Sequence, residues 1–189
     1  MRRFLLIINF VVLLVLGIFA KDSIIAELTP SPHTEVVFSP NQGATAAIIK
    51  ALSEARSSIL VSAYSFTSQD LAKALLEAKK RQVMVKLILD KSQMSQRYSS
   101  SRFFINQGFE LRIDVKHAIY HNKVMIIDNK TVITGSFNFT KAAESKNAEN
   151  LLIIRDNPQL ANAYTQNWWF HWGQAISPDE FLNKKSRSN

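Results

Sequence analysis

The chain contains no cysteine among its 189 residues. A disulfide framework, a thiolate metal site and a cysteine nucleophile are therefore all excluded. A chain without thiols is compatible with any compartment. Its length has room for one ordinary domain, with a core large enough for independent stability.

Acidic residues are scarce relative to basic ones. The chain has 15 Asp and Glu against 23 Lys and Arg, which gives a formal net charge of +8 at pH 7. This excess favours a polyanionic partner, either nucleic acid or an anionic membrane surface. Charge alone does not choose between these two partners.

The N-terminus carries a long apolar run. Arg2 and Arg3 precede residues 4–19, which are apolar apart from Asn9 and Gly17, and Ala20 stands at a plausible cleavage point. This pattern predicts a leader over residues 1–20 that directs the chain to the periplasm or out of the cell. The run is slightly short for a bilayer span, so an uncleaved N-terminal membrane anchor is the alternative. No evident amphipathic segment for membrane docking follows residue 30.

The rest of the chain predicts one α/β domain over residues 35–175, after a linker over residues 21–34 and before a basic tail over residues 176–189. Apolar runs with β-branched residues predict strands, and apolar positions at helical spacing predict helices. Their alternation favours a mixed, largely parallel central sheet with helices on both faces, its first half being the parallel part. Strands are expected at 35–38, 58–64, 83–89, 109–113 and 151–154, with a hairpin at 121–135, and helices at 44–55, 69–81, 95–107 and from 157 onward. In that last helix, Trp168, Trp169, Phe170 and Trp172 are expected to be core residues.

Polar side chains concentrate in and around the hairpin, inside an otherwise apolar stretch. The turn composition of residues 128–131 favours a two-residue loop at Asn129 and Lys130. Lys123 would then face Ser136, and His121 would face Asn138, so that all four side chains share one face of the sheet. A longer loop would shift this register. An imidazole, an ammonium, a hydroxyl and a carboxamide in one place can hold and attack a phosphate.

Each of these residue types has a defined use at a phosphate. His121 is the expected nucleophile, because neutral imidazole can attack phosphorus and form a phosphohistidine. Lys123 would neutralise the charge of the transition state, while Ser136 and Asn138 would donate hydrogen bonds to the non-bridging oxygens. Asp128 belongs to the same set of candidates, although its place at the turn favours a structural role.

No metal site and no cofactor are expected. His117 and His121 would lie about 13 Å apart on an extended strand, too far to share an ion. His33, His117 and His171 lack the neighbours of His121 and are interpreted as structural or surface residues.

The spacing of these residues resembles the signature of the phospholipase D superfamily: H-x-K, four residues, Asp, six residues and G-S-x-N. Residues 63–67 (AYSFT) and 135–144 (GSFNFTKAAE) extend the resemblance, which covers about residues 35–174, to the single-motif bacterial metal-independent endonucleases of that superfamily. It implies a phospholipase D-like fold and chemistry without a metal. It also implies that Glu149 is a carboxylate that holds the catalytic histidine and fixes its tautomer.

The H-x-K element occurs once, whereas lipid-cleaving members of the superfamily usually carry it twice. One histidine cannot readily act both as the nucleophile and as the acid on the opposite side of an in-line displacement. A two-fold homodimer that joins two copies of His121 is therefore expected, as the resemblance also implies. The predicted function is an exported endonuclease for DNA, with RNA as a further candidate substrate. A phospholipase D-type lipid phosphodiesterase is the alternative, and a catalytically silent binding protein is a third hypothesis.

Overall fold

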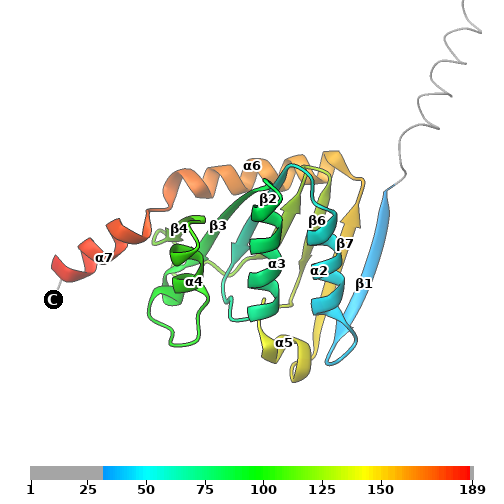
Figure 1. The fold of residues 1–189 in the computed structure, drawn as a ribbon, viewed down its shortest axis with the longest axis horizontal. Coiled ribbons are helices and arrows are strands. Elements are labelled where there is room, and N and C mark those ends of the chain that lie inside the picture. The colour runs from blue at the N-terminus through cyan, green and yellow to red at the C-terminus, as the bar shows by residue number, and fades with distance from the viewer. Residues whose placement is uncertain (1–31, 188–189) are drawn as a thin grey trace, which may run out of the picture. The chain divides into compact units, whose positions relative to one another are not determined.

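Seven strands form one mixed sheet in the computed structural model, which describes residues 32–187 (Figure 1). Their order across the sheet is β1-β7-β6-β5-β2-β3-β4. The strands are β1 (His33–Ser39), β2 (Ser58–Ala63), β3 (Met84–Asp90), β4 (Glu110–Asp114), β5 (Lys123–Ile127), β6 (Thr131–Gly135) and β7 (Glu149–Arg155). The predicted fold class, a mixed α/β sheet flanked by helices, is confirmed.

Parallel pairing is confined to β2, β3 and β4, the first half of the sheet in chain order that was predicted to be parallel. The other four pairings are antiparallel. Five strands nevertheless run in one direction, because only β5 and β7 are reversed. The connection between β5 and β6 is short, and a connection of this kind can only join antiparallel neighbours.

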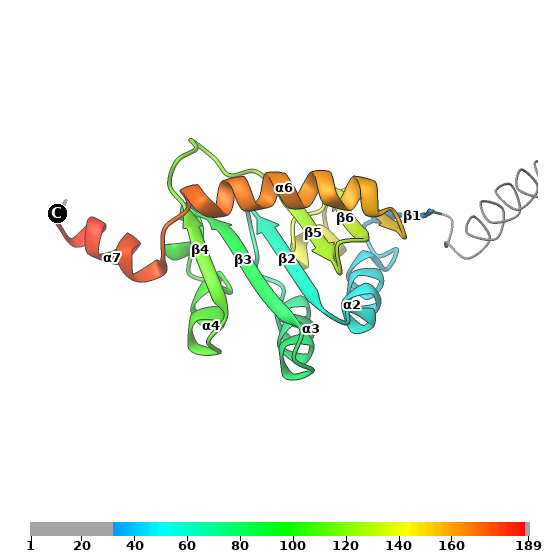
Figure 2. The same ribbon diagram turned by 90° about the horizontal axis from the view of Figure 1, so that it is seen from above.

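Helices cover both faces of the sheet. The helices α2 (Ala44–Glu54), α3 (Gln69–Lys80) and α4 (Ser101–Asn106) lie on one face, and α6 (Pro158–Gln174) crosses the other (Figure 2). Three shorter or peripheral elements complete the described chain: the 3-10 helix η1 (Lys91–Met94), α5 (Lys141–Ser145) and α7 (Pro178–Arg187). The helix predicted over 95–107 forms only in its second half, after a turn that follows η1.

Local sequence explains where the helices next to the site begin. The hydroxyl of Ser68 accepts a hydrogen bond from the amide of Leu71 and caps α3, as the sequence predicts. At the start of α2, the carboxylate of Glu144 accepts hydrogen bonds from the amides of Gly43 and Thr45, at 3.2 and 2.7 Å. Glu144 is the last residue of GSFNFTKAAE, one of the stretches in which the sequence resembles the phospholipase D superfamily. This residue of the stretch therefore has a structural role.

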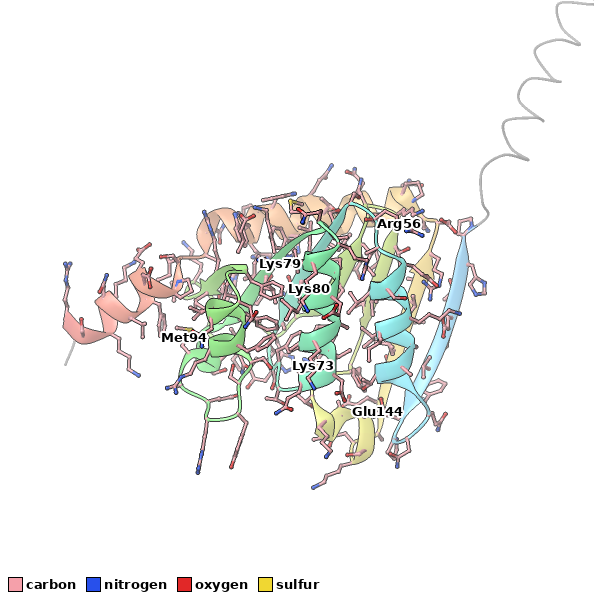
Figure 3. All side chains as sticks on the ribbon, viewed as in Figure 1. Arg56, Lys73, Lys79, Lys80, Met94 and Glu144 are labelled. Carbon is pink, nitrogen blue, oxygen red and sulfur yellow. The ribbon has the colours of Figure 1, made fainter. Side chains whose placement is uncertain are left out.

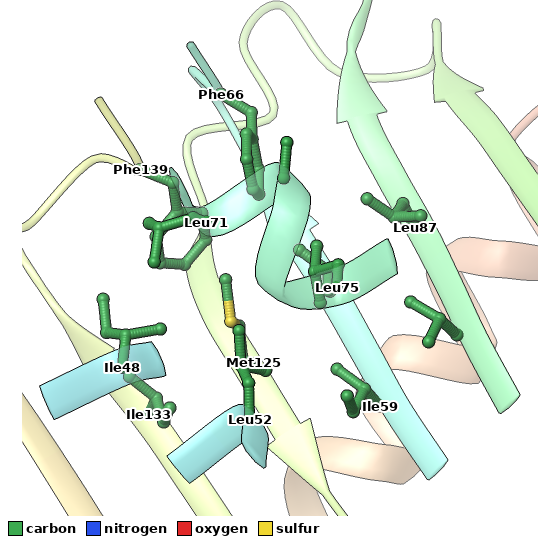
Figure 4. Close-up of a cluster of buried hydrophobic side chains, with 14 of the residues drawn as sticks. Ile48, Leu52, Ile59, Phe66, Leu71, Leu75, Leu87, Met125, Ile133 and Phe139 are labelled. Atoms are coloured by element: carbon green, nitrogen blue, oxygen red, sulfur yellow. The ribbon is translucent and has the colours of Figure 1, made fainter. Parts of the chain in front are cut away.

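The core has two layers, one on each side of the sheet. The larger layer packs Leu71 and Leu75 of α3 and Ile48 of α2 against Met125 and other strand residues (Figure 4). The smaller layer lies under α6.

Trp168 is the central residue of the smaller layer. It is 2% exposed, and its Nε1 donates a hydrogen bond to the carbonyl of Val61 at 3.1 Å. The prediction of a core role is confirmed for Trp168 but is wrong for Trp169 and Phe170, which are 42% and 62% exposed. Consecutive residues on a helix are rotated by about 100°, so a run of aromatics cannot all face the sheet.

Two segments differ from the predicted boundaries. β1 begins at His33, inside the predicted linker. In the predicted tail, Ile176 forms an antiparallel bridge with Ile113 of β4, and the residues after it form α7. The predicted leader, and most of the linker, lie outside the described residues. Within residues 32–187, none of the helices has the length and apolar character needed to cross a bilayer.

Candidate active site

The candidate residues lie together at one end of the strands of the sheet. β2 ends at Ala63 and β6 ends at Gly135, and the reversed strands β5 and β7 begin at this same end. Ala63 is the Cα partner of Lys123 in the register of β2 and β5. Residues just beyond these strand ends therefore lie side by side, although they come from positions 64 to 149 of the chain.

His121 and Lys123 form the centre of the site. The Nζ atom of Lys123 lies 3.4 Å from Nδ1 and 3.3 Å from Nε2 of His121. The imidazole is exposed, and its ring lies 4.6 Å from the ring of Tyr64. Only an unprotonated ring nitrogen can accept a hydrogen bond from an ammonium, and such a nitrogen is also the atom that can attack phosphorus.

Lys123 is largely buried for a lysine. The residue is 8% exposed, and its Nζ lies over the ring of Tyr64, 5.4 Å from the ring centroid. Burial lowers the pKa of Lys123 below its ordinary value, and the negative charge of Glu149 opposes this shift. A phosphate that entered the site would supply a second negative partner to this cation.

Ser136 and Glu149 form a second pair at the same end of the strands. The hydroxyl of Ser136 donates to Oε2 of Glu149 at 2.6 Å, and the amide group of Asn147 donates to Oε1 at 3.0 Å. The expected hydrogen bond from His121 to Glu149 is not among the contacts of the described residues. Both oxygens of Glu149 already have a donor, and its link to His121 and Lys123 is the electrostatic effect on Lys123.

The hairpin register differs from the prediction by one residue. The observed Cα partners are Ile127 and Thr131, Ile126 and Val132, and Met125 and Ile133. The loop therefore has three residues, Asp128 to Lys130. Lys123 is consequently not opposite Ser136, so the predicted four-residue arrangement does not arise from direct cross-strand pairing.

Gly135 brings Ser136 to the site instead. Its φ of 144° lies in a region that side chains rarely adopt, and a Cβ atom there would be 2.3 Å from the carbonyl oxygen of Asn150. The amides of Ser136 and Phe137 both donate to that same carbonyl, at 3.1 and 3.3 Å. β6 leaves the regular ladder here, and the hydroxyl of Ser136 reaches Glu149.

Asn138 lies in the loop that follows β6. Its side-chain oxygen is buried and has no hydrogen-bond partner within residues 32–187. Rotation of the carboxamide by 180° exchanges its oxygen and nitrogen atoms, so this position can offer either an acceptor or a donor. A buried polar atom without a partner is costly. With the carboxamide rotated, its NH2 group would take this position and could donate to a phosphate oxygen.

Asp128 is not part of this cluster. Its carboxylate accepts hydrogen bonds from the amides of Arg56, Ser57 and Ser58 and from the hydroxyl of Ser57, at 2.7 to 2.9 Å. Burial alone would raise the pKa of Asp128, but these hydrogen bonds outweigh it and the pKa lies below the ordinary value. Asp128 therefore links the turn of the hairpin to the start of β2, which is the structural role that its place at the turn predicts.

Sequence reasoning did not assign a role to three residues of the site. They are Tyr64, which contacts both His121 and Lys123, and Asn147 and Asn150, which contact Glu149 and Ser136. Tyr64 directly follows the carboxyl end of β2, the usual place for functional residues in such sheets. The two asparagines had no comparable signal.

The α/β domain brings together an imidazole, an ammonium, a hydroxyl and a carboxylate at one end of its sheet, and these are groups that proteins use to bind and cleave phosphate esters. Residues 48–172 match the family described as cardiolipin synthase, PLD-like domain. The chain belongs to the phospholipase D superfamily and is a phosphodiesterase of that superfamily.

Individual relatives agree with this assignment. The chain is 44% identical over 137 residues to a phospholipase D of Rickettsia typhi, covering 72% of this chain and 67% of that protein. It is 32% identical over 143 residues to the mitochondrial cardiolipin hydrolase of Xenopus laevis, covering 76% of this chain and 64% of that protein. Among solved structures, Nuc from Salmonella typhimurium, a phospholipase D family member, superposes with a TM-score of 0.74 at 44% identity, covering 77% of this chain and 97% of that chain.

Proposed function

We propose that the chain is an exported, metal-independent endonuclease that hydrolyses the phosphodiester bonds of DNA, with RNA as a further candidate substrate, through a phosphohistidine intermediate. The observation that carries this proposal is the contact between the exposed imidazole of His121 and the buried ammonium of Lys123. The ammonium occupies the position in which a cation can stabilise a pentacoordinate phosphorus beside the attacking nitrogen.

The reaction has two displacements at one phosphorus atom. A ring nitrogen of His121 forms a bond to phosphorus while the bond to the leaving nucleoside oxygen breaks, and an acid on the opposite side gives that oxygen a proton. Water then attacks the phosphorus of the phosphohistidine, and the nitrogen–phosphorus bond breaks. The group that served as the acid in the first step accepts a proton from this water. Lys123 and Asn138 hold the non-bridging oxygens through both steps, and Ser136 joins them when its hydroxyl proton turns from Glu149 to the phosphate.

The acid in this scheme is His121 of the partner subunit in a two-fold homodimer. An apolar surface beside the site supports such a dimer: Val36 and Phe38 on β1 are 51% and 52% exposed. Both project from the face of the sheet opposite Val37, which packs on the core beneath α2. Phe38 pairs with Asn150, next to Glu149, so a second copy docked on this surface would lie close to the site.

A basic cleft next to the site supports a nucleic-acid substrate. Two adjoining clefts, of about 580 and 630 Å³, share Thr67, Gln69 and Lys141. The amide of Thr67 bonds to the carbonyl of Phe139, the residue after Asn138. The first cleft is also lined by Lys73, at the end of α3 that adjoins α5 (Figure 3), and by Arg97. Cations in this position can bind successive phosphates.

Other basic residues are held by the protein itself. Lys79, Arg81 and Lys91 donate hydrogen bonds to backbone carbonyls of Gln107, Leu52 and His117. We therefore assign substrate binding to Lys73, Arg97 and Lys141.

A lipid phosphodiesterase is the second candidate function. The names of the Rickettsia and Xenopus relatives, phospholipase D and cardiolipin hydrolase, favour it. The same site can attack either kind of phosphodiester, so the substrate has to be decided by experiment.

One assay separates the candidates. The purified chain is incubated in excess EDTA with supercoiled plasmid and, in parallel, with vesicles of phosphatidylcholine and of cardiolipin. We expect plasmid nicking that survives chelation and is lost in His121→Ala, while the control His33→Ala keeps full activity. Head-group release without nicking would establish the lipid activity instead, and neither activity would leave a binding protein.

Export belongs to the same proposal. Residues 1–20 would act as a cleaved leader, or as an N-terminal membrane anchor if they are retained, and residues 21–34 as the linker to the domain. N-terminal sequencing of the chain recovered from cell fractions distinguishes the two. A mature chain that begins near residue 21 supports cleavage, and an intact N-terminus in the membrane fraction supports the anchor.

A further inference from the structure

A second cluster of chemically active side chains lies near the end of the sheet opposite β1. Asp114 is the last residue of β4, His117 lies in the loop that leads to β5, and His171 is in the last turn of α6. One potential ligand atom from each of these three side chains lies within 4.8 Å of the other two. None of the three takes part in the proposed cleavage reaction.

The contacts between Asp114 and His117 are close. Nδ1 of His117 lies 3.1 Å from Oδ1 and 3.0 Å from Oδ2 of Asp114, and the amide of His117 donates to Oδ1 at 3.1 Å. The carboxylate is fully buried. Its ion partner within residues 32–187 is the imidazole of His117, which is a cation only when it is protonated. A buried negative charge with so little compensation favours the binding of a cation.

His171 supplies an independent observation. Its Nδ1 atom is buried and has no hydrogen-bond partner within the described part of the chain. Its ring centroid lies 5.1 Å from that of His117 and 5.4 Å from that of Tyr120. A buried ring nitrogen without a partner is a costly arrangement for a histidine that has only a packing role.

We propose that Asp114, His117 and His171 bind one divalent transition-metal ion, with zinc as the natural occupant. Two imidazoles and one carboxylate are a common zinc ligand set, and they leave a fourth tetrahedral position for water. Zinc bonds of 2.0 to 2.1 Å place neighbouring ligand atoms about 3.3 Å apart. The distances of 3.0 and 3.1 Å between His117 and Asp114 are close to this spacing, and His171, whose ligand atom lies within 4.8 Å of the other two, would have to move closer to complete the set.

The role of this ion is structural. It would join the loop between β4 and β5 to α6, two segments far apart in the sequence (Figure 2). Tyr120 packs against both imidazoles, and its amide is held by the carboxylate of Asp90 at 2.8 Å. The next residue is His121, so an ion here fixes the segment that carries the nucleophile. No reaction step uses the ion, so chelation would loosen this segment without removing any group that takes part in the proposed cleavage.

Zinc binding to the full chain tests the proposal without any measurement of cleavage. The protein is stripped with EDTA, dialysed and titrated with zinc chloride in a calorimeter. We expect one equivalent bound with micromolar or tighter affinity, together with a higher melting temperature. His117→Gln and His171→Gln should each weaken binding about tenfold or more.

Two matched variants serve as controls. His33→Gln changes a histidine on the opposite edge strand, and His121→Gln changes the catalytic candidate, so both should bind zinc like the parent chain. If a variant fails to fold by circular dichroism, cobalt titration of the parent chain replaces it, and visible d–d bands of a tetrahedral ion are expected. Absence of zinc binding, undiminished binding in both cluster variants, or binding that is lost only in His121→Gln would overturn the proposal. Since affinity is the readout, failure of the nuclease assay would not affect this result.

Discussion

At the scale of single residues, the position of Lys123 determines the electrostatics of the proposed active site. Its ammonium is buried against Tyr64 and lies within 3.4 Å of both nitrogens of His121, while Glu149 contributes the nearby negative charge. The site therefore holds a preorganised cation before substrate arrives. A cation of this kind stabilises a transition state more than a solvated one, because water does not need to be displaced during the reaction.

Lys123→Gln should lower kcat for plasmid cleavage by about 100- to 1000-fold, the loss typical of removing one preorganised donor to a transition state. Glutamine keeps much of the length and the hydrogen-bonding capacity of lysine but removes the charge. The measurement is single-turnover cleavage at saturating DNA, with the fold checked by circular dichroism. Lys130→Gln is the matched control, because Lys130 is exposed in the turn at the other end of β5. Activity of Lys123→Gln close to that of the control would contradict the proposed role.

Much of the site could be predicted from residue types and spacing, because His121, Lys123 and Ser136 lie in one short segment. The hydrogen bond between Ser136 and Glu149 could not be predicted, since it depends on the conformation of Gly135. The pairing of His117 with His171 also requires the three-dimensional structure. It arises only when α6 packs across the sheet.

At the scale of elements, the β5–β6 hairpin shows why composition identifies a turn more reliably than it fixes the turn's length. Asp128 and Asn129 have φ values of 52° and 51°, a conformation that Asp and Asn tolerate best among non-glycine residues. The prediction placed the loop at Asn129 and Lys130. Asp128 accepts hydrogen bonds from residues at the start of β2, and these hold it in the loop. The loop is therefore one residue longer than predicted, and the register of β5 and β6 differs by one residue.

Asp128→Asn should lower the free energy of unfolding by about 1–2 kcal/mol at pH 7, a modest value because the carboxylate is partly exposed to solvent. The pKa of Asp128 is lower in the folded chain than its unfolded value near 3.9. The stabilisation is therefore fully present above pH 3.9 and is lost as the pH falls through the folded pKa. The difference between parent and variant should be constant near neutrality and should shrink in more acidic solution.

Urea unfolding at several pH values measures this difference. Glu77→Gln is a suitable control, since it removes an exposed carboxylate whose ion pair with Lys80 is largely solvated. A stability difference for Asp128→Asn that stayed the same down to the lowest pH would show that the charge of Asp128 is not the cause. Cleavage activity of Asp128→Asn should stay close to that of the parent at temperatures where both are folded.

At the scale of the whole molecule, one subunit provides one copy of each proposed catalytic group. Sequence reasoning leads to a dimer because a single imidazole cannot readily serve both sides of an in-line displacement. The surface that would bury the second copy was not predictable, because it depends on where α6 lies. α6 packs over β2, β4, β5 and β6, and Val36 and Phe38 on β1 stay half exposed.

A subunit-mixing experiment tests whether the two copies share one site. The parent chain and His121→Ala are unfolded together, refolded in chosen ratios and assayed at constant total protein. If each productive site needs His121 from both subunits, activity follows the square of the parent fraction, and an equal mixture keeps about one quarter of the parent activity. If each chain acts alone, the equal mixture keeps about one half.

Phe38→Arg provides the matching physical test, since a charge on the exposed apolar surface should yield monomers in sedimentation and should abolish cleavage while the fold is retained. Monomers with undiminished activity would show that one His121 is sufficient, and the acid for the leaving oxygen would then have to come from the same chain.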